Sequence, residues 1–484
     1  MAQLLDWRTK RVNSKAKGVI KNLYYTVAAN FVTLLISVLL NLFVPKLLGI
    51  KEYSYWQLYV FYSSYVGFLH LGWIDGIYLK IGGEEYNNLN KAKLGSQYWY
   101  LGLFELILAV VVGAYAFLFL PTSNKSLILI LTAVVAVITI AKQFIQYILQ
   151  STNRIREYAH LSRSDRYLYI FFLAVYFIFG GRNFFWLIIL DIISKLLVTF
   201  WGMYQIKDML FSQLVPLRDV WSEILDNINI GSKLMLSNIA SMLIIGTIRF
   251  FVQNRWSIEA FGKLSFTLSI SNMFLTFINA IGVVMFPLLR RTDNNRLSRL
   301  FITLRTLFVP ITYSFLLFYV PVKIILEAWL PQYSVSLMYM GILFPMVVYE
   351  GRMSLLINTY LKALRKEKTI LFVNIITLII SIFAGAITVY LFENLLLSVG
   401  LIIFCLAIRC NLAEYLLSKS LQIKLNTKTA QETILSFIFI LSNLIVSNSW
   451  ISFIIYAISF SLFILINIKS IKESFSIFYQ LMKS

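Results

Sequence analysis

The sequence predicts an all-α polytopic membrane protein of about 14 transmembrane helices, built as two six-helix lobes in a parallel pseudo-repeat plus two C-terminal helices. Of the 484 residues, 59% are hydrophobic and only 13% are charged, and the mean hydropathy is +0.77. Soluble domains are roughly 45–50% apolar and about 25% charged. The apolar runs are long and continuous, which favours helices over the alternating strands of a barrel.

Apolar segments of spanning length define the predicted helices. The first six lie at 24–46, 54–73, 98–120, 127–149, 166–181 and 184–204, the next six at 233–253, 264–288, 300–322, 336–361, 369–391 and 395–416, and the last two at 433–447 and 450–467. An even number of spans places both termini on one side of the membrane.

An internal repeat is centred on residues 231–291. Moved back by 208 positions, this stretch lies over the start of the chain, so that Asn238 falls on Asn30 and Ile258 on Ile50. Two copies of six spans enter the membrane with the same polarity, as in transporters with a central site between two lobes. The predicted domains are an N-terminal lobe at 1–210, a cytoplasmic linker with an amphipathic stretch at 211–232, a C-terminal lobe at 233–420, and two extra spans with a cytoplasmic tail at 421–484.

The basic residues predict the orientation. With the amino terminus in the cytoplasm, the inner loops carry roughly four times as many Lys and Arg residues as the outer loops, in agreement with the positive-inside rule. The formal net charge of +21 is therefore explained by topology, and no nucleic-acid partner is expected. The outer loops hold only Lys46, Lys51, Lys125, Arg182, Arg255, Lys263 and Lys323.

Charged residues inside spans are candidates for function. Lys142 and Arg352 lie deep and lack an acid three or four positions away, so we expect them to meet an anion such as a substrate phosphate. Arg249 lies nearer the outer boundary and could either bind substrate or reach the interface. Lys195 is a further candidate ligand for the substrate, although Asp191, four positions away on the same helix face, can neutralise it. Snorkelling to the cytoplasmic boundary is expected of Arg305, Arg409 and Glu414.

Other polar residues complete the candidate site. Amide side chains in spans suit sugar hydroxyls, although hydrogen bonds between helices are the alternative explanation. The amides singled out are Asn30, Asn41, Asn238 and Asn272, and the acids considered for coupling or gating are Asp75, Glu105, Asp191 and Glu350. No glycine-rich phosphate loop or metal-spaced His or Cys set is present, so we expect neither an enzyme nor a bound cofactor.

Three motifs resemble those of a known family. Gly72-Trp-Ile-Asp75-Gly76 looks like its Gly-x-x-Asp-Gly turn after the second span, and 249–266 resembles its seventh-to-eighth span hairpin. The stretch 358–368 resembles the end of its tenth span. With the predicted architecture, the chain resembles bacterial Wzx-type flippases of polysaccharide or O-antigen repeat units, in the multidrug/oligosaccharidyl-lipid/polysaccharide exporter superfamily. Ile248 departs from the pattern, because relatives often have Asp before the arginine.

The resemblance implies a function and partners. The substrate would be an undecaprenyl-diphosphate-linked glycan repeat unit, moved by alternating access from the inner to the outer leaflet of the bacterial cytoplasmic membrane. A coupling ion, H⁺ or Na⁺, could enter through one of the acids named above. The other expected partners are membrane lipids and the polysaccharide polymerase and chain-length machinery.

Three alternatives stay open. A peptidoglycan-precursor flippase would handle the same lipid-diphosphate chemistry. A multidrug or cation antiporter would need acids in its cavity, and the first predicted span has none. A membrane glycosyl polymerase or ligase would need a large outer loop, whereas the outer loops here are short.

Overall fold

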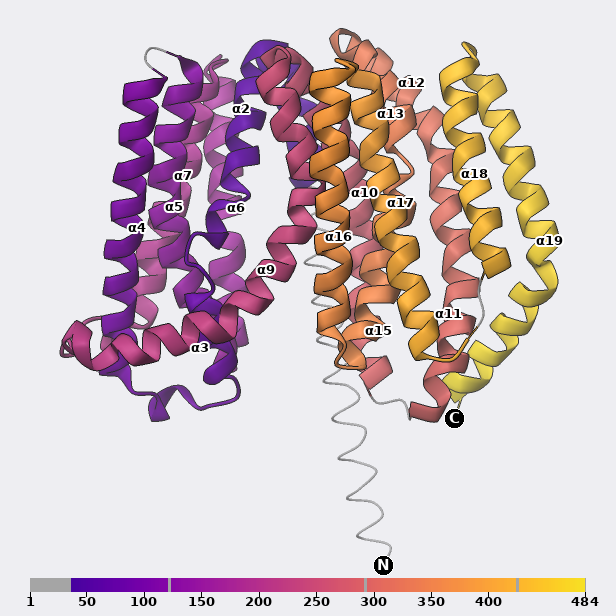
Figure 1. Ribbon diagram of the computed structural model, residues 1–484. Helices are drawn as coiled ribbons and strands as arrows, with labels where there is room; N and C mark the ends of the chain where they lie inside the picture. The colour runs from indigo at the N-terminus through magenta and orange to yellow at the C-terminus, as the bar shows by residue number, and fades with distance from the viewer. Residues whose placement is uncertain (1–35, 121–122, 291–293, 424–425, 484) are drawn as a thin grey trace, which may run out of the picture. The chain divides into compact units, whose positions relative to one another are not determined.

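The computed structural model describes residues 36–120, 123–290, 294–423 and 426–483, and all regular elements in these ranges are helical (Figure 1). Within the described ranges, eight helices are long and apolar enough to cross a membrane, and a bent pair makes a ninth. The described parts of the predicted spans are helical over most of their length, with breaks in the second and tenth spans, which confirms the all-α polytopic fold class. The first predicted span is described from residue 36 onward, as the helix Ile36–Leu48.

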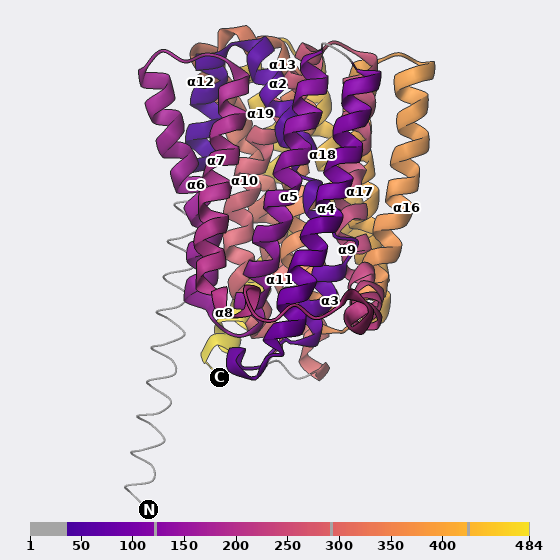
Figure 2. The ribbon, with the colours of Figure 1, turned by 90° about the vertical axis from the view of Figure 1, so that its left-hand side faces the viewer.

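The chain forms two compact units, one of which comprises residues 47–265. In this unit α4 packs against α5, and α5 also contacts α2, α6 and α7; Figure 2 shows α4 and α5 side by side. Its helices are α2 (Ile50–Ser63), α3 (Trp73–Lys80), α4 (Lys91–Phe119), α5 (Asn124–Ser151), α6 (Ile155–Ile178), α7 (Phe184–Gln205), α8 (Lys207–Leu210), α9 (Leu217–Arg255) and the start of α10 (Ile258–Arg290).

The other unit comprises residues 1–46 and 266–484. Its closest helix pairs are α16 with α17, α11 with α19 and α18 with α19. Besides the rest of α10, its helices are α11 (Asn294–Ser314), α12 (Tyr319–Trp329), α13 (Ser334–Leu343), α14 (Met346–Arg352), α15 (Asn358–Ala363), α16 (Glu367–Ala386), α17 (Leu395–Ser420), α18 (Asn426–Ile445) and α19 (Ser449–Lys483).

Capping residues explain where several long helices begin. Asn90, Ser123, Asn183 and Asn394 each accept a hydrogen bond from a backbone N–H in the first turn of α4, α5, α7 and α17. These side chains satisfy donors that would otherwise have no partner at a helix start.

The internal repeat has a structural counterpart. α2 begins at Ile50 and α10 at Ile258, the two residues that the offset of 208 brings into register. Ser54 and Gly262 are equivalent in this repeat, and a Cβ atom at Gly262 would lie 1.8 Å from the Ser54 hydroxyl. Contact between equivalent residues is expected where two repeats meet near their symmetry axis.

Two predicted spans are not continuous helices. The second, predicted at 54–73, leaves the α-helix after Ser63, and regular helix resumes only at Trp73. The tenth, predicted at 336–361, bends by 44° between α13 and α14 and contains a π-helical segment at Met353–Ile357. Hydropathy detects the length of an apolar run but not a break within it.

Most of the predicted linker is helical. Residues 217–232, within the predicted linker 211–232, form the first half of α9, which continues without a break into the seventh span. Figure 1 shows this half of α9 lying along α3 at one end of the α4–α7 helices before it turns to run beside them. The lobe boundaries drawn at this linker stay a prediction.

The short helix α8 is held in place by the charged side chain of Asp208. Asp208 forms an ion pair of 2.6 Å with Lys91 and accepts a hydrogen bond of 2.7 Å from Tyr86. Burial alone would raise the pKa of the Asp208 carboxyl, but these partners prevail and lower it. These contacts join the start of α4 to α8, which directly follows α7.

Glycines let α3 and α9 approach backbone to backbone. A Cβ atom at Gly76 would lie 1.9 Å from the carbonyl oxygen of Asn227, and one at Gly231 would lie 2.0 Å from that of Gly72. Small residues four apart are a common device for close helix packing in membranes. The Gly-x-x-Asp-Gly motif is therefore a packing motif as well as a turn.

This packing predicts the effect of one added methyl group. Gly231→Ala should destabilise the protein by about 1–3 kcal/mol, the usual cost of overpacking, and lower its melting temperature in detergent, followed by tryptophan fluorescence. Gly102→Ala is the matched control, because a Cβ there meets nothing within 4 Å. Equal melting of the two variants would contradict this account of the contact.

Candidate functional site

The break in the second span lines a polar cavity. After α2, the chain forms a 3-10 turn at Val66–Phe68, and Leu71 and Gly72 then adopt φ values of 55° and 89°. Left-handed backbone is uncommon for leucine. Non-helical backbone within a membrane is tolerated where it is buried in protein or lines a water-filled cavity.

The cavity has a volume of about 460 Å³ and lies between this turn, α5 and α9. Asn238, one of the predicted amides, lies in its wall, and the other polar side chains that line it are uncharged as well. The lining residues are Ser64, Gly67, Phe68, Gln143, Tyr147, Asn238, Ser241 and Met242.

A histidine and a carboxylate lie next to this wall. His70 is 1% exposed, and its Nε2 lies 3.3 Å from the Gln143 amide and 3.8 Å from Oδ2 of Asp75. Asp75 is buried as well and has Tyr147 as a hydrogen-bond partner. The predicted gating residue Asp75 is thus linked to two cavity-lining side chains.

Arg249 lies on the same helix as the cavity wall. Seven residues separate it from Met242, which corresponds to about 10 Å along α9. Its guanidinium donates a hydrogen bond of 2.9 Å to Ser265 and lies 4.5 Å from the ring centre of Phe61 and 5.3 Å from that of Phe261. Its Nε is buried without a hydrogen-bond partner, and no carboxylate among the described residues pairs with it.

The other five bases singled out within the spans are paired with acids, which corrects the expectation for two of them. Lys142 lies 2.5 Å from Asp165 of α6. Arg352 lies 2.5 Å from Glu414 of α17 and 3.0 Å from Glu432 of α18. The expectation that these two cations lack an acidic partner is wrong, because their partners lie on other helices, beyond the reach of an i,i+4 rule. A substrate-binding role for Lys142 and Arg352 stays a prediction.

Snorkelling is also the wrong explanation for Arg305, Arg409 and Glu414. Arg305 pairs with Glu414 and Glu432 at 2.8 Å each. Arg305, Arg352, Glu414 and Glu432 thus form a four-charge cluster with no net charge that joins α11, α14, α17 and α18. Each of its side chains is at most 3% exposed.

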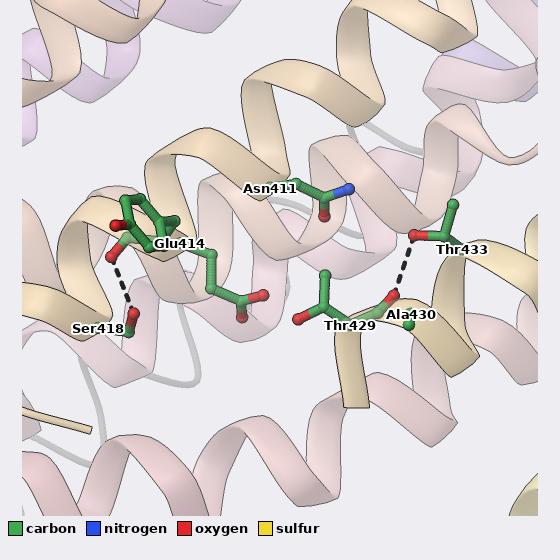
Figure 3. A pocket seen from close by; sticks show the side chains of 7 residues that line it. Asn411, Glu414, Ser418, Thr429, Ala430 and Thr433 are labelled. Atoms are coloured by element: carbon green, nitrogen blue, oxygen red, sulfur yellow. Dashed lines mark hydrogen bonds between the residues drawn. The ribbon is translucent and has the colours of Figure 1, made fainter. Parts of the chain in front are cut away.

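A second pocket opens beside this cluster. It has a volume of about 240 Å³ between α17 and α18. Figure 3 shows Asn411 and Glu414 on one wall and Thr429 and Thr433 on the other. Both Glu414 oxygens are already engaged by arginines, so this carboxylate is part of the cluster and is not free to hold a ligand.

Two further ion pairs involve predicted coupling acids. Arg409 lies 2.7 Å from Glu350 and also donates to the Asn374 amide oxygen. Lys195 lies 2.6 Å from Asp191, which confirms the predicted pair, and Tyr59 donates a hydrogen bond to the same carboxylate.

The remaining candidates are not gathered around the cavity. Glu105 is fully buried in α4, and neither of its oxygens has a hydrogen-bond partner within the part of the chain that the structure describes. Asn41 is half-buried in the helix Ile36–Leu48, and Asn272 is exposed on α10. Asn30 lies outside the described residues.

Several residues of these sites were missed in the sequence. Gln143 directly follows Lys142 on α5, and Tyr147 lies four positions after Gln143. This spacing places Gln143 and Tyr147 on one helix face. Asp165 and Glu432 lie just outside the predicted fifth and thirteenth spans, where an acid resembles a loop residue. His70 lies near the end of the predicted second span, 54–73, and the break that buries it there was not foreseen.

Comparison with solved structures identifies the fold. The chain superposes on the lipid II flippase MurJ in an inward closed conformation with a TM-score of 0.66 and 11% identity, over 93% of this chain and 100% of that one. It matches a multidrug resistance MATE family transporter of the MOP superfamily, in an inward-facing conformation, with a TM-score of 0.57 and 12% identity, over 86% and 96% of the two chains. No protein-family model and no curated protein sequence matches it. The chain thus has the fold that these two transporters share.

The four-charge cluster predicts a rescue. Arg352→Met leaves two buried carboxylates with one arginine and should cost about 3–5 kcal/mol of stability. Arg352→Met combined with Glu432→Gln leaves the Arg305–Glu414 pair balanced and should recover at least half of the lost stability, measured by thermal melting.

The same variants decide what Arg352 does. A structural role predicts that activity in cells returns with stability in the double variant. Activity that stays lost in a stable double variant would restore the earlier expectation that Arg352 binds substrate.

Proposed function

We propose that this protein is a lipid-linked oligosaccharide flippase of the bacterial cytoplasmic membrane. It moves an undecaprenyl-diphosphate-linked glycan repeat unit from the inner to the outer leaflet by alternating access, for surface polysaccharide biosynthesis, with both termini in the cytoplasm. Arg249, an intramembrane arginine without a carboxylate partner among the described residues, is the observation that carries this proposal.

Arg249 has the chemistry of a phosphate ligand. A guanidinium in a membrane is costly unless an anion or a hydrogen-bond acceptor matches it, and here one serine hydroxyl and two aromatic faces do so only in part. Its planar fork of donors fits two phosphate oxygens at once. Lys142, Lys195, Arg352 and Arg409 are less suited, because an acid already neutralises each of them.

The cavity beside the broken second span has the chemistry of a glycan site. Amides and hydroxyls of Gln143, Tyr147, Asn238 and Ser241 can both donate and accept hydrogen bonds, as sugar hydroxyls require. The distance of about 10 Å along α9 from Met242 to Arg249 would let a sugar and its diphosphate contact the same helix. The lipid tail would stay in the bilayer.

A driving force follows from the charge of the substrate. Two phosphate charges moving outward across a negative-inside potential gain about 2.3 kcal/mol each per 100 mV. The polysaccharide polymerase and chain-length machinery would then take up the product at the outer surface, and no catalytic role is required of this chain.

Two alternatives share the fold. A peptidoglycan-precursor flippase is supported by the likeness to MurJ and would use the same diphosphate ligand. A multidrug or cation antiporter is supported by the likeness to a MATE transporter, but the Asp75 carboxylate beside the cavity already has protein partners. A membrane glycosyl polymerase or ligase fits least, because neither likeness is to an enzyme.

Arg249 should be required for transport and dispensable for folding. Arg249→Met keeps the apolar stem between the two rings and removes the charge, so surface polysaccharide in the native host should fall at least tenfold while membrane insertion and melting stay close to wild type. Arg249→Lys should retain part of the activity. The control, Arg182→Met, removes an exposed base from the connection between α6 and α7 and should have no effect.

The substrate class requires a separate experiment. In proteoliposomes, the flipping of a fluorescent undecaprenyl-diphosphate glycan should compete with unlabelled substrate. Competition by lipid II alone would favour the peptidoglycan precursor, and competition by a lipophilic cation alone would favour the antiporter.

A further inference from the structure

The turn after the second span holds His70 in one defined tautomer. Nδ1 of His70 accepts a hydrogen bond of 3.0 Å from the backbone N–H of Gly72. A ring nitrogen that accepts a hydrogen bond carries no proton, so the proton of the neutral ring is on Nε2. The amide nitrogen of Gln143 lies 3.3 Å from Nε2, and with this tautomer the Gln143 amide must turn its oxygen toward the ring to accept the Nε2–H. The binding of a diphosphate or a glycan proposed above makes no use of this buried side chain.

The protonated side of the ring faces a carboxylate. Asp75 of α3 lies 3.8 Å from Nε2, and from α5 the ring meets Gln143, while Tyr147 reaches Asp75. From α9, the backbone of Gly231 and Ser232 packs against Gly72. On α9, the carboxylate of Glu223 is engaged by Lys93 and Gln97. Among the described residues, Asp75 is the only carboxylate paired with His70.

A second proton on His70 is incompatible with this turn. The proton would have to bind Nδ1, at the position toward which the Gly72 N–H now points. Two N–H groups cannot share one hydrogen bond, so protonation must break the bond and turn Gly72 away. Leu71 holds left-handed backbone with a φ of 55°, which costs energy for a residue with a side chain, whereas Gly72 adopts its φ of 89° freely. A lost hydrogen bond therefore releases strain at Leu71.

We propose that His70 and Asp75 form a proton-binding site whose occupancy opens the Leu71–Gly72 turn. A proton from water binds Nδ1, the imidazolium forms an ion pair with Asp75, and the Gly72 N–H loses its acceptor. Gly72 is packed against Gly231, and the same helix α9 carries the cavity residues Asn238 and Ser241. Binding of the proton therefore changes the cavity wall. This site would couple proton binding to transport, and this coupling role rests on the function proposed above.

The proton site can be tested without any substrate. The chain has only two histidines, His70 and His160, so His160→Asn leaves a single imidazole for ¹⁵N-histidine NMR in lipid nanodiscs. Between about pH 8 and about pH 4, the His70 signal should change from the Nε2–H tautomer to the imidazolium. The protection factor of the Gly72 amide, which is its hydrogen-exchange rate corrected for the base-catalysed intrinsic rate at each pH, should fall about tenfold over the same pH interval, as expected for one lost hydrogen bond.

Two variants separate titration from packing. His70→Asn keeps an acceptor for the Gly72 N–H but cannot take up a proton, so the protection factor of Gly72 should stay high at every pH. Asp75→Asn should shift the protonation of His70 to lower pH, because the imidazolium loses its counter-charge. A ring that stays neutral throughout, or that becomes charged while the Gly72 protection factor is unchanged, would overturn the proposal.

A transport measurement then separates this proposal from the proposed function. In proteoliposomes, a pH gradient should accelerate the flipping of the fluorescent lipid-linked glycan by wild type and by His160→Asn, but not by His70→Asn. If wild type titrates as described and flips no glycan, the proton site stands and the proposed substrate fails. If flipping occurs and the gradient affects wild type and His70→Asn equally, the coupling role fails.

Discussion

The cost of removing a charge from water governs this structure. Five of the six bases singled out within the spans meet an acid on a neighbouring turn or helix, and these pairs decide which helices lie together. In the unit formed by 1–46 and 266–484, the cluster of Arg305, Arg352, Glu414 and Glu432 ties four helices to one another. Removing any single member would leave an uncompensated charge in an apolar region.

Against this background Arg249 stands apart. The rings of Phe61 and Phe261 offer it a weak electrostatic contact, and Ser265 accepts one of the five N–H bonds that a guanidinium can donate. The protein keeps this charge in place without neutralising it. An arrangement of this kind costs stability, and a bound anion is the physical compensation that fits the position.

Much of the fold could be predicted from the sequence because hydropathy and the repeat act over long stretches. The start of α2 at Ile50 and of α10 at Ile258 agrees with the offset of the repeat. The site was harder to predict, since Lys142 and Asp165 are separated by 23 residues and Arg352 and Glu432 by 80, and only the folded chain brings them together. The break at 64–72 was missed for a related reason: Leu71 is an ordinary apolar residue, and nothing in the local sequence predicts its φ of 55° or the packing of Gly72 on α9.

The two units differ in how their polar groups are held. In the unit of 1–46 and 266–484, the four charges of the cluster are at most 3% exposed and are already paired with one another, although a pocket opens beside Glu414. In the unit of 47–265, uncharged polar groups surround an open cavity, a spanning segment is interrupted, and a histidine bonds to the backbone of the turn that it stabilises. Rearranging the first set would expose unpaired charges to the membrane, whereas rearranging the second exchanges one hydrogen bond for another. Conformational change driven by a ligand or a proton should therefore begin in residues 47–265 at the contact of α3 with α9, which meet through glycines, while the buried Lys142–Asp165 pair of the same unit stays intact.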